Sequence, residues 1–178
     1  MAARQGAVMN EPSAEESASR IRAGALGAID GITSVAGVAI GVAAAHPARS
    51  ELLLAGISAL IGGALSMGAG EYASVSAGRD AELADGLPAA QLPSPWAAAF
   101  ASAIAFTVGA IVPVLAVLLP PAQWRIWAAF VAVILALAAA GVISAKLGGV
   151  HVRRAVVRTL LGGGIAMCAT YVFGALAA

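Results

Sequence analysis

Two side chains with metal-binding chemistry lie four residues apart in an apolar stretch of the sequence. Met67 supplies a thioether and Glu71 a carboxylate, within the run 54–82 that reads LAGISALIGGALSMGAGEYASVSAGRDAE. Residues four apart lie on one face of a helix, so both side chains are expected to point the same way. A carboxylate inside a spanning helix costs roughly 2.5–3.5 kcal/mol on insertion scales and usually faces a bundle interior or a water-filled path. Glu71 is therefore interpreted as functional.

A second acid, Asp30, opens the apolar segment DGITSVAGVAIG at residues 30–41. At a rise of about 1.5 Å per residue, Asp30 lies roughly 10 Å from the N-terminal end of the first apolar run, which is taken as one side of the membrane. By the same rise, Glu71 lies roughly 9 Å and Met67 roughly 15 Å from that side of the membrane. Helices joined by a short connection are usually neighbours. The three side chains are therefore predicted to be able to converge on one site.

Two carboxylates and one thioether per chain suit a divalent transition metal. Oxygen ligands attract hard cations, and one soft sulfur favours Fe²⁺ and similar ions over Mg²⁺ and Ca²⁺. Carboxylates must lose their protons to bind a metal, so coupling of metal movement to protons is chemically available. Because one chain offers few ligands, a site assembled from two copies across a two-fold axis is favoured.

A stripe of small residues lies beside these ligands and indicates how two copies could meet. Its members recur every four residues and are Gly62, Ser66, Gly70, Ser74 and Gly78. Small residues at this spacing let another helix approach closely inside a membrane. The stripe therefore predicts a helix contact, and with it a homodimer.

The elements that must position these residues are predicted to be membrane-spanning helices. The chain is 61% hydrophobic and 11% charged, whereas soluble domains carry about 25% charged residues. Five apolar runs approach the roughly 20 residues that cross a bilayer core, and these are 23–45, 52–77, 97–119, 126–145 and 155–177. The prediction is an all-α integral membrane protein, with a polar cytoplasmic tail at 1–22 and a five-helix transmembrane domain at 23–178.

The positions of the charged residues predict the orientation and exclude some classes of function. Eight of the ten Lys and Arg residues fall on the side of the N-terminus, which predicts a cytoplasmic N-terminus and a C-terminus outside. A net charge of +1 provides no basic face for a nucleic acid. Cys168 is the single cysteine, which excludes an intrachain disulfide. No Ser/His/Asp or Cys/His arrangement suggests an enzyme.

The segment 30–41, the S-M-G-x-G-E-Y pattern at 66–72 and the Gly-rich fifth span resemble the vacuolar iron transporter family. The resemblance covers essentially 22–178 and is to a short, bacterial or nodulin-like form, which suggests a bacterial cell membrane. It implies a homodimer with its path at the two-fold interface and proton-coupled export of Fe²⁺ or Mn²⁺ from the cytosol. No resident cofactor is implied, because metal and protons are the transported ions.

The same resemblance implies a role for each candidate residue. It makes Asp30 the metal and proton ligand of the first helix, Met67 the thioether ligand of the second, and Glu71 the acid of the G-E-Y motif. Two positions depart from the family pattern. Ala59 stands where many members have a glutamate, and residues 79–95 stand where iron-transporting relatives insert a cytoplasmic metal-binding helical domain.

Alternative interpretations remain open at this point. The acids in the short 79–95 connection, Asp80, Glu82 and Asp85, are expected to be solvated rather than to capture metal. Asp30 could instead pair with Lys146 or Arg158, and Glu71 with Arg79 or Lys146. For the whole protein, the alternatives to metal export are a non-transporting membrane scaffold or subunit and an exporter of organic cations.

Overall fold

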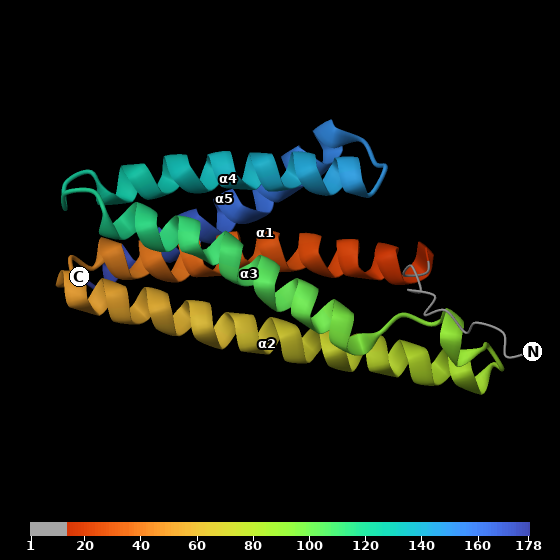
Figure 1. Cartoon of the computed structure of the whole chain (residues 1–178). Helices are drawn as coiled ribbons and strands as arrows, with labels where there is room; N and C mark the ends of the chain where they lie inside the picture. The colour runs from red at the N-terminus through yellow and green to blue at the C-terminus, as the bar shows by residue number, and fades with distance from the viewer. Residues whose placement is uncertain (1–13) are drawn as a thin grey trace, which may run out of the picture.

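Five long helices make up the part of the chain that the computed structural model describes, residues 14–178 (Figure 1). They are α1 (Ala14–Ala44), α2 (Arg49–Ala84), α3 (Pro95–Leu118), α4 (Arg125–Leu147) and α5 (Val152–Leu176), with a short 3₁₀ helix η1 (Ala89–Gln91) before α3. All five are long and apolar enough to cross a membrane. The predicted all-α class and the five helices able to span a membrane are therefore confirmed.

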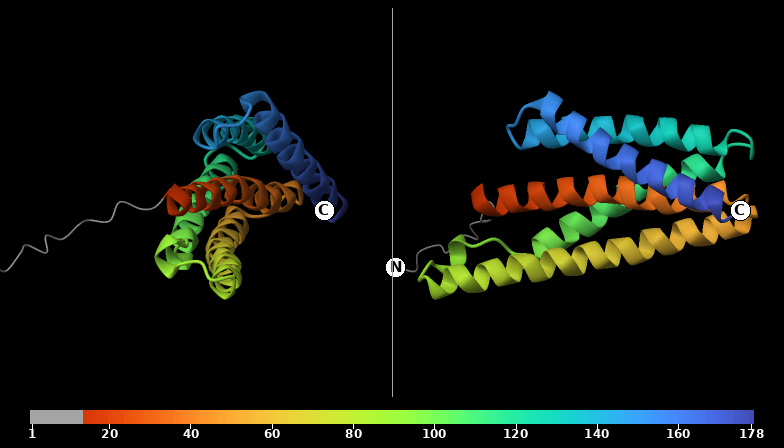
Figure 2. Two further views of the ribbon diagram at one scale, coloured as in Figure 1. Left: turned by 90° about the vertical axis from the view of Figure 1, so that its right-hand side faces the viewer. Right: turned by 180° about the vertical axis from the view of Figure 1, so that it is seen from behind.

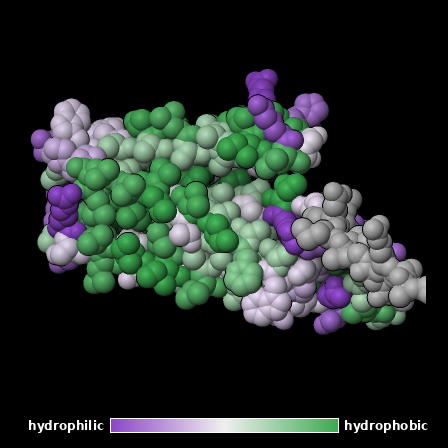
Figure 3. Space-filling view, viewed as in Figure 1, coloured by the Kyte–Doolittle hydropathy of each residue, from purple (hydrophilic) through white to green (hydrophobic). Residues whose placement is uncertain are grey.

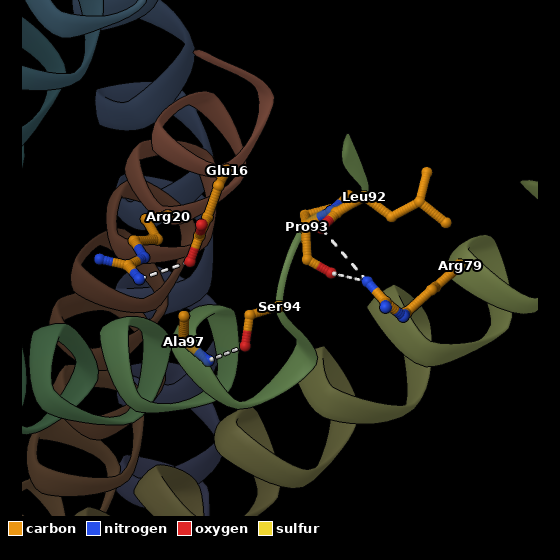
Figure 4. A network of polar contacts seen from close by, with 7 residues as sticks. All are labelled: Glu16, Arg20, Arg79, Leu92, Pro93, Ser94 and Ala97. Atoms are coloured by element: carbon orange, nitrogen blue, oxygen red, sulfur yellow. Dashed lines mark hydrogen bonds and ion pairs between the residues drawn. The ribbon is translucent and has the colours of Figure 1, made fainter. Parts of the chain in front are cut away.

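α1 begins earlier than the apolar pattern indicates. Residues 14–22 of the predicted polar tail form its first turns, and the rest of that tail, residues 1–13, lies outside the described residues. Glu16 and Arg20 form an ion pair one turn apart on this segment (Figure 4). Oppositely charged side chains at this spacing stabilise a helix. The ion pair therefore helps to explain why α1 is helical before its apolar run begins.

α2 continues past the predicted end of its span at residue 77. Its last turns read RDAELA, and Ala, Glu and Leu are strong helix formers even where no membrane surrounds them. Asp80 and Glu82 are exposed on this extension, and exposed Asp85 caps its end. The acids placed by sequence in a flexible connection are therefore mostly carried on a helix.

The rest of the connection is tied to α2 by Arg79. Its guanidinium donates hydrogen bonds to the carbonyl oxygens of Leu92 at 3.2 Å, Pro93 at 3.4 Å and Ala89 at 3.1 Å, the first two of which Figure 4 draws. Ser94 then caps α3, because its hydroxyl accepts from an amide in the first turn. The connection is thus held by one arginine on one side and by a helix cap on the other.

α1 lies at the centre of the bundle and packs against all four other helices. Figure 2 shows it between α3 and α5, with α2 along another side. One buried cluster joins α1, α3, α4 and α5, and its members include Ile32, Ile40, Val117, Leu137 and Met167. A central helix that touches every neighbour determines how each of the others is placed around it.

The crossing of α1 and α3 depends on glycine. A Cβ atom built on Gly31 would overlap the carbonyl oxygen of Phe106, and one built on Gly109 would overlap that of Ala28. The two backbones are so close that neither glycine could carry a side chain at the contact. Small residues permit this close packing between membrane helices.

We expect Gly31→Ala to lower the free energy of unfolding by about 1–3 kcal/mol, the usual cost of overpacking. The added methyl group would meet backbone of α3, which cannot move aside as a side chain could. Gly164→Ala is the matched control, because a Cβ there meets nothing within 4 Å and gains the same helix propensity. Denaturant unfolding in detergent, followed by circular dichroism, measures the difference. Equal stability of the two variants would contradict the contact.

The surface divides into an apolar middle and two polar ends. Figure 3 shows hydrophobic residues over the middle of the molecule and hydrophilic residues at its ends. Leu65 on α2 and Leu135 on α4 are 71% and 65% exposed, as expected of side chains that face lipid tails. The three tryptophans, Trp96, Trp124 and Trp127, are exposed near the ends of helices, where interfacial aromatic residues belong.

Candidate functional site

Asp30 lies half-buried on α1, where it lines a groove between α1 and α5. The groove has a volume of about 440 Å³, and its walls are Leu26, Ile29, Asp30 and Thr33 of α1 with Arg158, Thr159, Gly162 and Gly163 of α5. An acid in the middle of an apolar helix thus faces a hollow between helices, and the hollow carries one basic side chain.

The groove exists because α1 and α5, which run parallel, touch at one end and separate toward the other (Figure 2). A Cβ on Gly174 would overlap the carbonyl oxygen of Gly41, so the two backbones are in contact there. One turn earlier, a Cβ on Gly37 would lie 3.5 Å from Thr170. Near Asp30, a Cβ on Gly163 would lie 3.5 Å from the hydroxyl oxygen of Thr33, whereas one on its exposed neighbour Gly162 would meet nothing within 4 Å. The two helices are thus still close at Thr33, and they separate from there toward the basic end of the bundle (Figure 2).

The carboxylate of Asp30 makes no hydrogen bond or ion pair with any residue in the range 14–178. Ser34 donates its hydroxyl to the backbone carbonyl of Asp30 at 2.6 Å and leaves the side chain untouched. Arg158 lines the same groove but stays beyond ion-pair distance, and Lys146 does not line it. Asp30 is thus available to a ligand from outside the described chain.

Met67 and Glu71 lie on the face of α2 that turns toward the bundle, and both are partly buried. Met67 packs against a cluster that contains Val35 and Phe106, and Ala59 packs against the same cluster two turns earlier. Glu71 makes no hydrogen bond or ion pair within the described range, and the guanidinium of Arg79 is engaged with backbone carbonyls instead.

Two contacts define how α1 and α2 are aligned along their length. The outer contact, nearer the end with most of the basic residues, joins Val75 of α2 to Ala23 of α1 in one buried cluster. The inner contact is made through Phe106, whose ring would overlap a Cβ on Gly63 and whose backbone would overlap one on Gly31. The two helices are antiparallel, so positions between these contacts on one helix lie level with those between them on the other.

All three predicted ligands lie between the outer and inner contacts. Asp30 does so on α1, and Met67 and Glu71 do so on α2. From the outer contact, Asp30 lies seven residues along α1, whereas Glu71 lies four and Met67 eight residues along α2. At about 1.5 Å per residue, Asp30 is therefore closer in depth to Met67 than to Glu71, whereas the estimate from the sequence placed Asp30 level with Glu71.

The three side chains do not line one cavity within a chain. The groove beside Asp30 includes neither Met67 nor Glu71, because Asp30 faces α5 whereas Met67 packs toward α3. Among residues 14–178, no three His, Cys, Asp or Glu side chains gather closely enough to hold a metal ion. That the three residues form one metal site stays a prediction.

Of the two basic side chains that the sequence offers as partners of Asp30, only Arg158 lines this groove, and it does so without forming an ion pair with that acid. The position of Arg158 in the sequence already indicated that it could reach this groove. Arg158 is about 9 Å from the start of α5, and α5 begins at the same end of the bundle as α1 (Figure 1). A basic and an acidic side chain at similar depth on parallel helices can reach one groove.

The small-residue stripe of α2 has no partner within the described chain. A Cβ on Gly62, Gly70 or Gly78 would meet nothing within 4 Å, and Ser66 and Ser74 are exposed. This is the opposite of the α1–α3 crossing, where glycines are covered. The stripe is a surface on which a further helix could pack closely.

The chain matches one family model and is similar to several curated proteins with related names. The family model described as VIT family matches residues 21–88 and 81–175. "Vacuolar iron transporter homolog 1" of Oryza sativa subsp. japonica is 43% identical over 168 residues, covering 85% of this chain and 71% of the relative. "Vacuolar iron transporter homolog 2" of the same plant is 40% identical, covering 85% and 87%. "Vacuolar iron transporter homolog 4" of Arabidopsis thaliana is 41% identical, covering 86% and 81%.

Proposed function

The chain is an integral membrane protein that belongs to the VIT family, and from this premise we propose that it exports Fe²⁺ or Mn²⁺ from the cytosol in exchange for protons. The relatives' names, vacuolar iron transporter homologs, support metal-ion transport and argue against an enzyme. The observation that carries the proposal is the carboxylate of Asp30, which is unpaired within residues 14–178 and faces a groove at membrane depth. Acids in such positions usually mark ion pathways.

The proposed metal ligands are Asp30, Met67 and Glu71, contributed by both copies of a homodimer. Doubling the chain would provide four carboxylates and two thioethers, a set that suits Fe²⁺ or Mn²⁺ better than Mg²⁺. The uncovered stripe on α2 supports this assembly, because it lies on the helix that carries Met67 and Glu71. On α1, Ser34 one turn beyond Asp30 is exposed as well, so the Asp30 side of the protomer also has open surface.

Proton exchange follows from the same carboxylates. A metal ion binds the deprotonated acid, and a proton can take its place once the metal has left. Asp30 would alternate between a metal-bound and a protonated form as the site opens to one side and then the other. Neither form leaves a bare charge in the apolar interior, where an isolated charge is costly.

The proposed direction rests on the distribution of basic residues. One end of the bundle carries Arg20, Arg22, Arg79, Lys146, Arg153, Arg154 and Arg158, and the other carries Arg49 and Arg125. The positive-inside rule makes the first end cytoplasmic, with the C-terminus outside, and a bacterial cell membrane is the proposed location. The Asp30 groove would then lie nearer the cytosol, where a metal ion destined for export would enter.

Metal flux into proteoliposomes tests the proposed function. We expect vesicles that contain the protein to take up Fe²⁺ and Mn²⁺ faster than empty vesicles do. A pH gradient that is acidic inside the vesicles should accelerate this uptake, because protons leave as the metal enters. A fluorescent chelator and a pH dye report the two ions together. Flux of an organic cation such as ethidium without metal flux would favour the organic-cation exporter, and absence of any flux would favour the scaffold. Either result would overturn metal export.

A further inference from the structure

A second groove, larger than the one beside Asp30, lies at the basic end of the bundle. It runs along α1 from Ser17 to Ile29, is closed on the other side by the end of α4 with the start of α5, and has a volume of about 670 Å³. Twelve residues of helix correspond to about 18 Å of length. The groove is therefore long and open at the side of the bundle, within the volumes of roughly 300–1,000 Å³ that are typical of ligand pockets.

The lining of this groove combines two positively charged side chains with apolar walls. Arg22 of α1 and Arg158 of α5 supply the charge, while Ile21, Ile29 and Leu147 supply apolar surface, and no acidic residue lines it. Both arginines are exposed and make no hydrogen bond or ion pair within the range 14–178. Arg158 also lines the groove beside Asp30 but forms no ion pair with that acid, so both guanidinium groups are available to an anion.

The surroundings of the groove indicate the source of that anion. The same end of the bundle carries further basic side chains, with Arg153 and Arg154 beside Arg158 around an adjoining hollow. In a chain whose helices span a membrane, this end meets the headgroup layer, and basic pockets between helices at that level bind anionic lipid headgroups. A soluble anion would satisfy the arginines but would leave the isoleucines and the leucine uncovered.

We propose that this groove binds one anionic phospholipid, with its phosphate between Arg22 and Arg158 and an acyl chain along Ile21, Ile29 and Leu147. Guanidinium groups bind phosphate through paired, charge-assisted hydrogen bonds. The bound lipid would join α1, α4 and α5 at the end where they diverge. This proposal does not depend on transport, although the groove adjoins the one beside Asp30 and shares Leu26, Ile29 and Arg158 with it.

Native mass spectrometry of the purified full chain in detergent tests the proposal with two defined lipids. We expect phosphatidylglycerol to remain bound where phosphatidylcholine is lost, and the double variant Arg22→Gln/Arg158→Gln to weaken phosphatidylglycerol binding by at least about tenfold. The double variant Arg153→Gln/Arg154→Gln is the matched control, because it removes the same charge at the same end outside this groove. Equal loss in both variants would show general surface attraction and would overturn the site.

A second variant tests the apolar half of the site without changing charge. Ala25→Trp should fill the groove and reduce phosphatidylglycerol binding to the level of the double arginine variant. If that variant does not fold, as judged by circular dichroism, Ala18→Trp at the exposed end of the same groove replaces it. Unchanged lipid binding in the folded tryptophan variant would overturn the acyl-chain placement.

Two further occupants are separated by the same measurements. If glycerol 3-phosphate displaces the lipid as well as added phosphatidylglycerol does, the arginines bind a soluble phosphate and the lipid proposal is wrong. If the arginine variants change the mass of the oligomer but not the retained lipid, a second copy of the chain covers the groove, and the proposal is wrong for that reason.

Discussion

Asp30→Asn is expected to abolish metal flux while leaving the fold and the oligomeric state of the protein unchanged. The amide keeps the size of the carboxylate but removes its charge. Two unit charges about 4 Å apart interact with about 4 kcal/mol near a protein surface, and this value is a minimum for a divalent ion. A loss of that size corresponds to about a thousandfold in metal affinity. Metal uptake by proteoliposomes and binding isotherms for Mn²⁺, an ion that does not oxidise in air, measure the two effects.

Asp80→Asn is the matched control for this variant. Asp80 is an exposed acid on the extension of α2 and does not line the groove, and its loss is expected to change flux by less than about twofold, because salt largely screens a charge at the surface. Wild-type flux with Asp30→Asn would remove Asp30 from the pathway. Equal losses in the two variants would mean that bulk surface charge, rather than a site, attracts the metal.

Gly70→Leu is expected to separate the proposed homodimer into monomers and to stop transport with it. Within the chain, a Cβ at this position meets nothing within 4 Å, so the isolated protomer should accommodate leucine without strain. At a close helix contact between two copies, the same side chain would overpack the interface by about 1–3 kcal/mol on each side of the two-fold axis. Light scattering after size-exclusion chromatography measures the mass, and flux is measured on the same sample.

Gly164→Leu controls for the addition of a bulky side chain to an uncovered membrane helix. A Cβ on Gly164 also meets nothing within 4 Å, but this residue lies on α5 and outside the stripe. It is expected to remain dimeric and active. A dimeric Gly70→Leu variant would place the interface elsewhere, and a monomeric variant that still transports would mean that each chain holds a complete path.

The two predictions separate the parts of the proposed mechanism. Loss of flux with Asp30→Asn but an intact dimer assigns the defect to the ligand, whereas loss of both with Gly70→Leu assigns it to assembly. The Gly31→Ala variant, which should weaken the protomer itself, provides the third reference. Stability, mass and flux measured on all variants therefore distinguish folding, dimerisation and ion binding.

The amino-acid sequence by itself determined the five helices able to cross a membrane and placed Asp30 and Glu71 inside two of them. A bilayer has a set thickness, so the length of an apolar run indicates a span. These inferences need only local geometry. They failed at the polar ends of α1 and α2, where good helix formers extend the helix beyond the membrane and hydropathy carries no information about the end.

Only the tertiary structure decided which helix each face meets. Sequence spacing places Asp30 on one stripe of α1 and Met67 on one stripe of α2, but it does not say that the first faces α5 and the second packs toward Phe106 of α3. Helix rotation follows from close contacts between segments far apart in the chain, such as Gly41 with Gly174. Those contacts depend on the joint shape of two surfaces, which neither sequence segment contains alone, and so the grooves beside Asp30 and Arg22 became visible only in three dimensions.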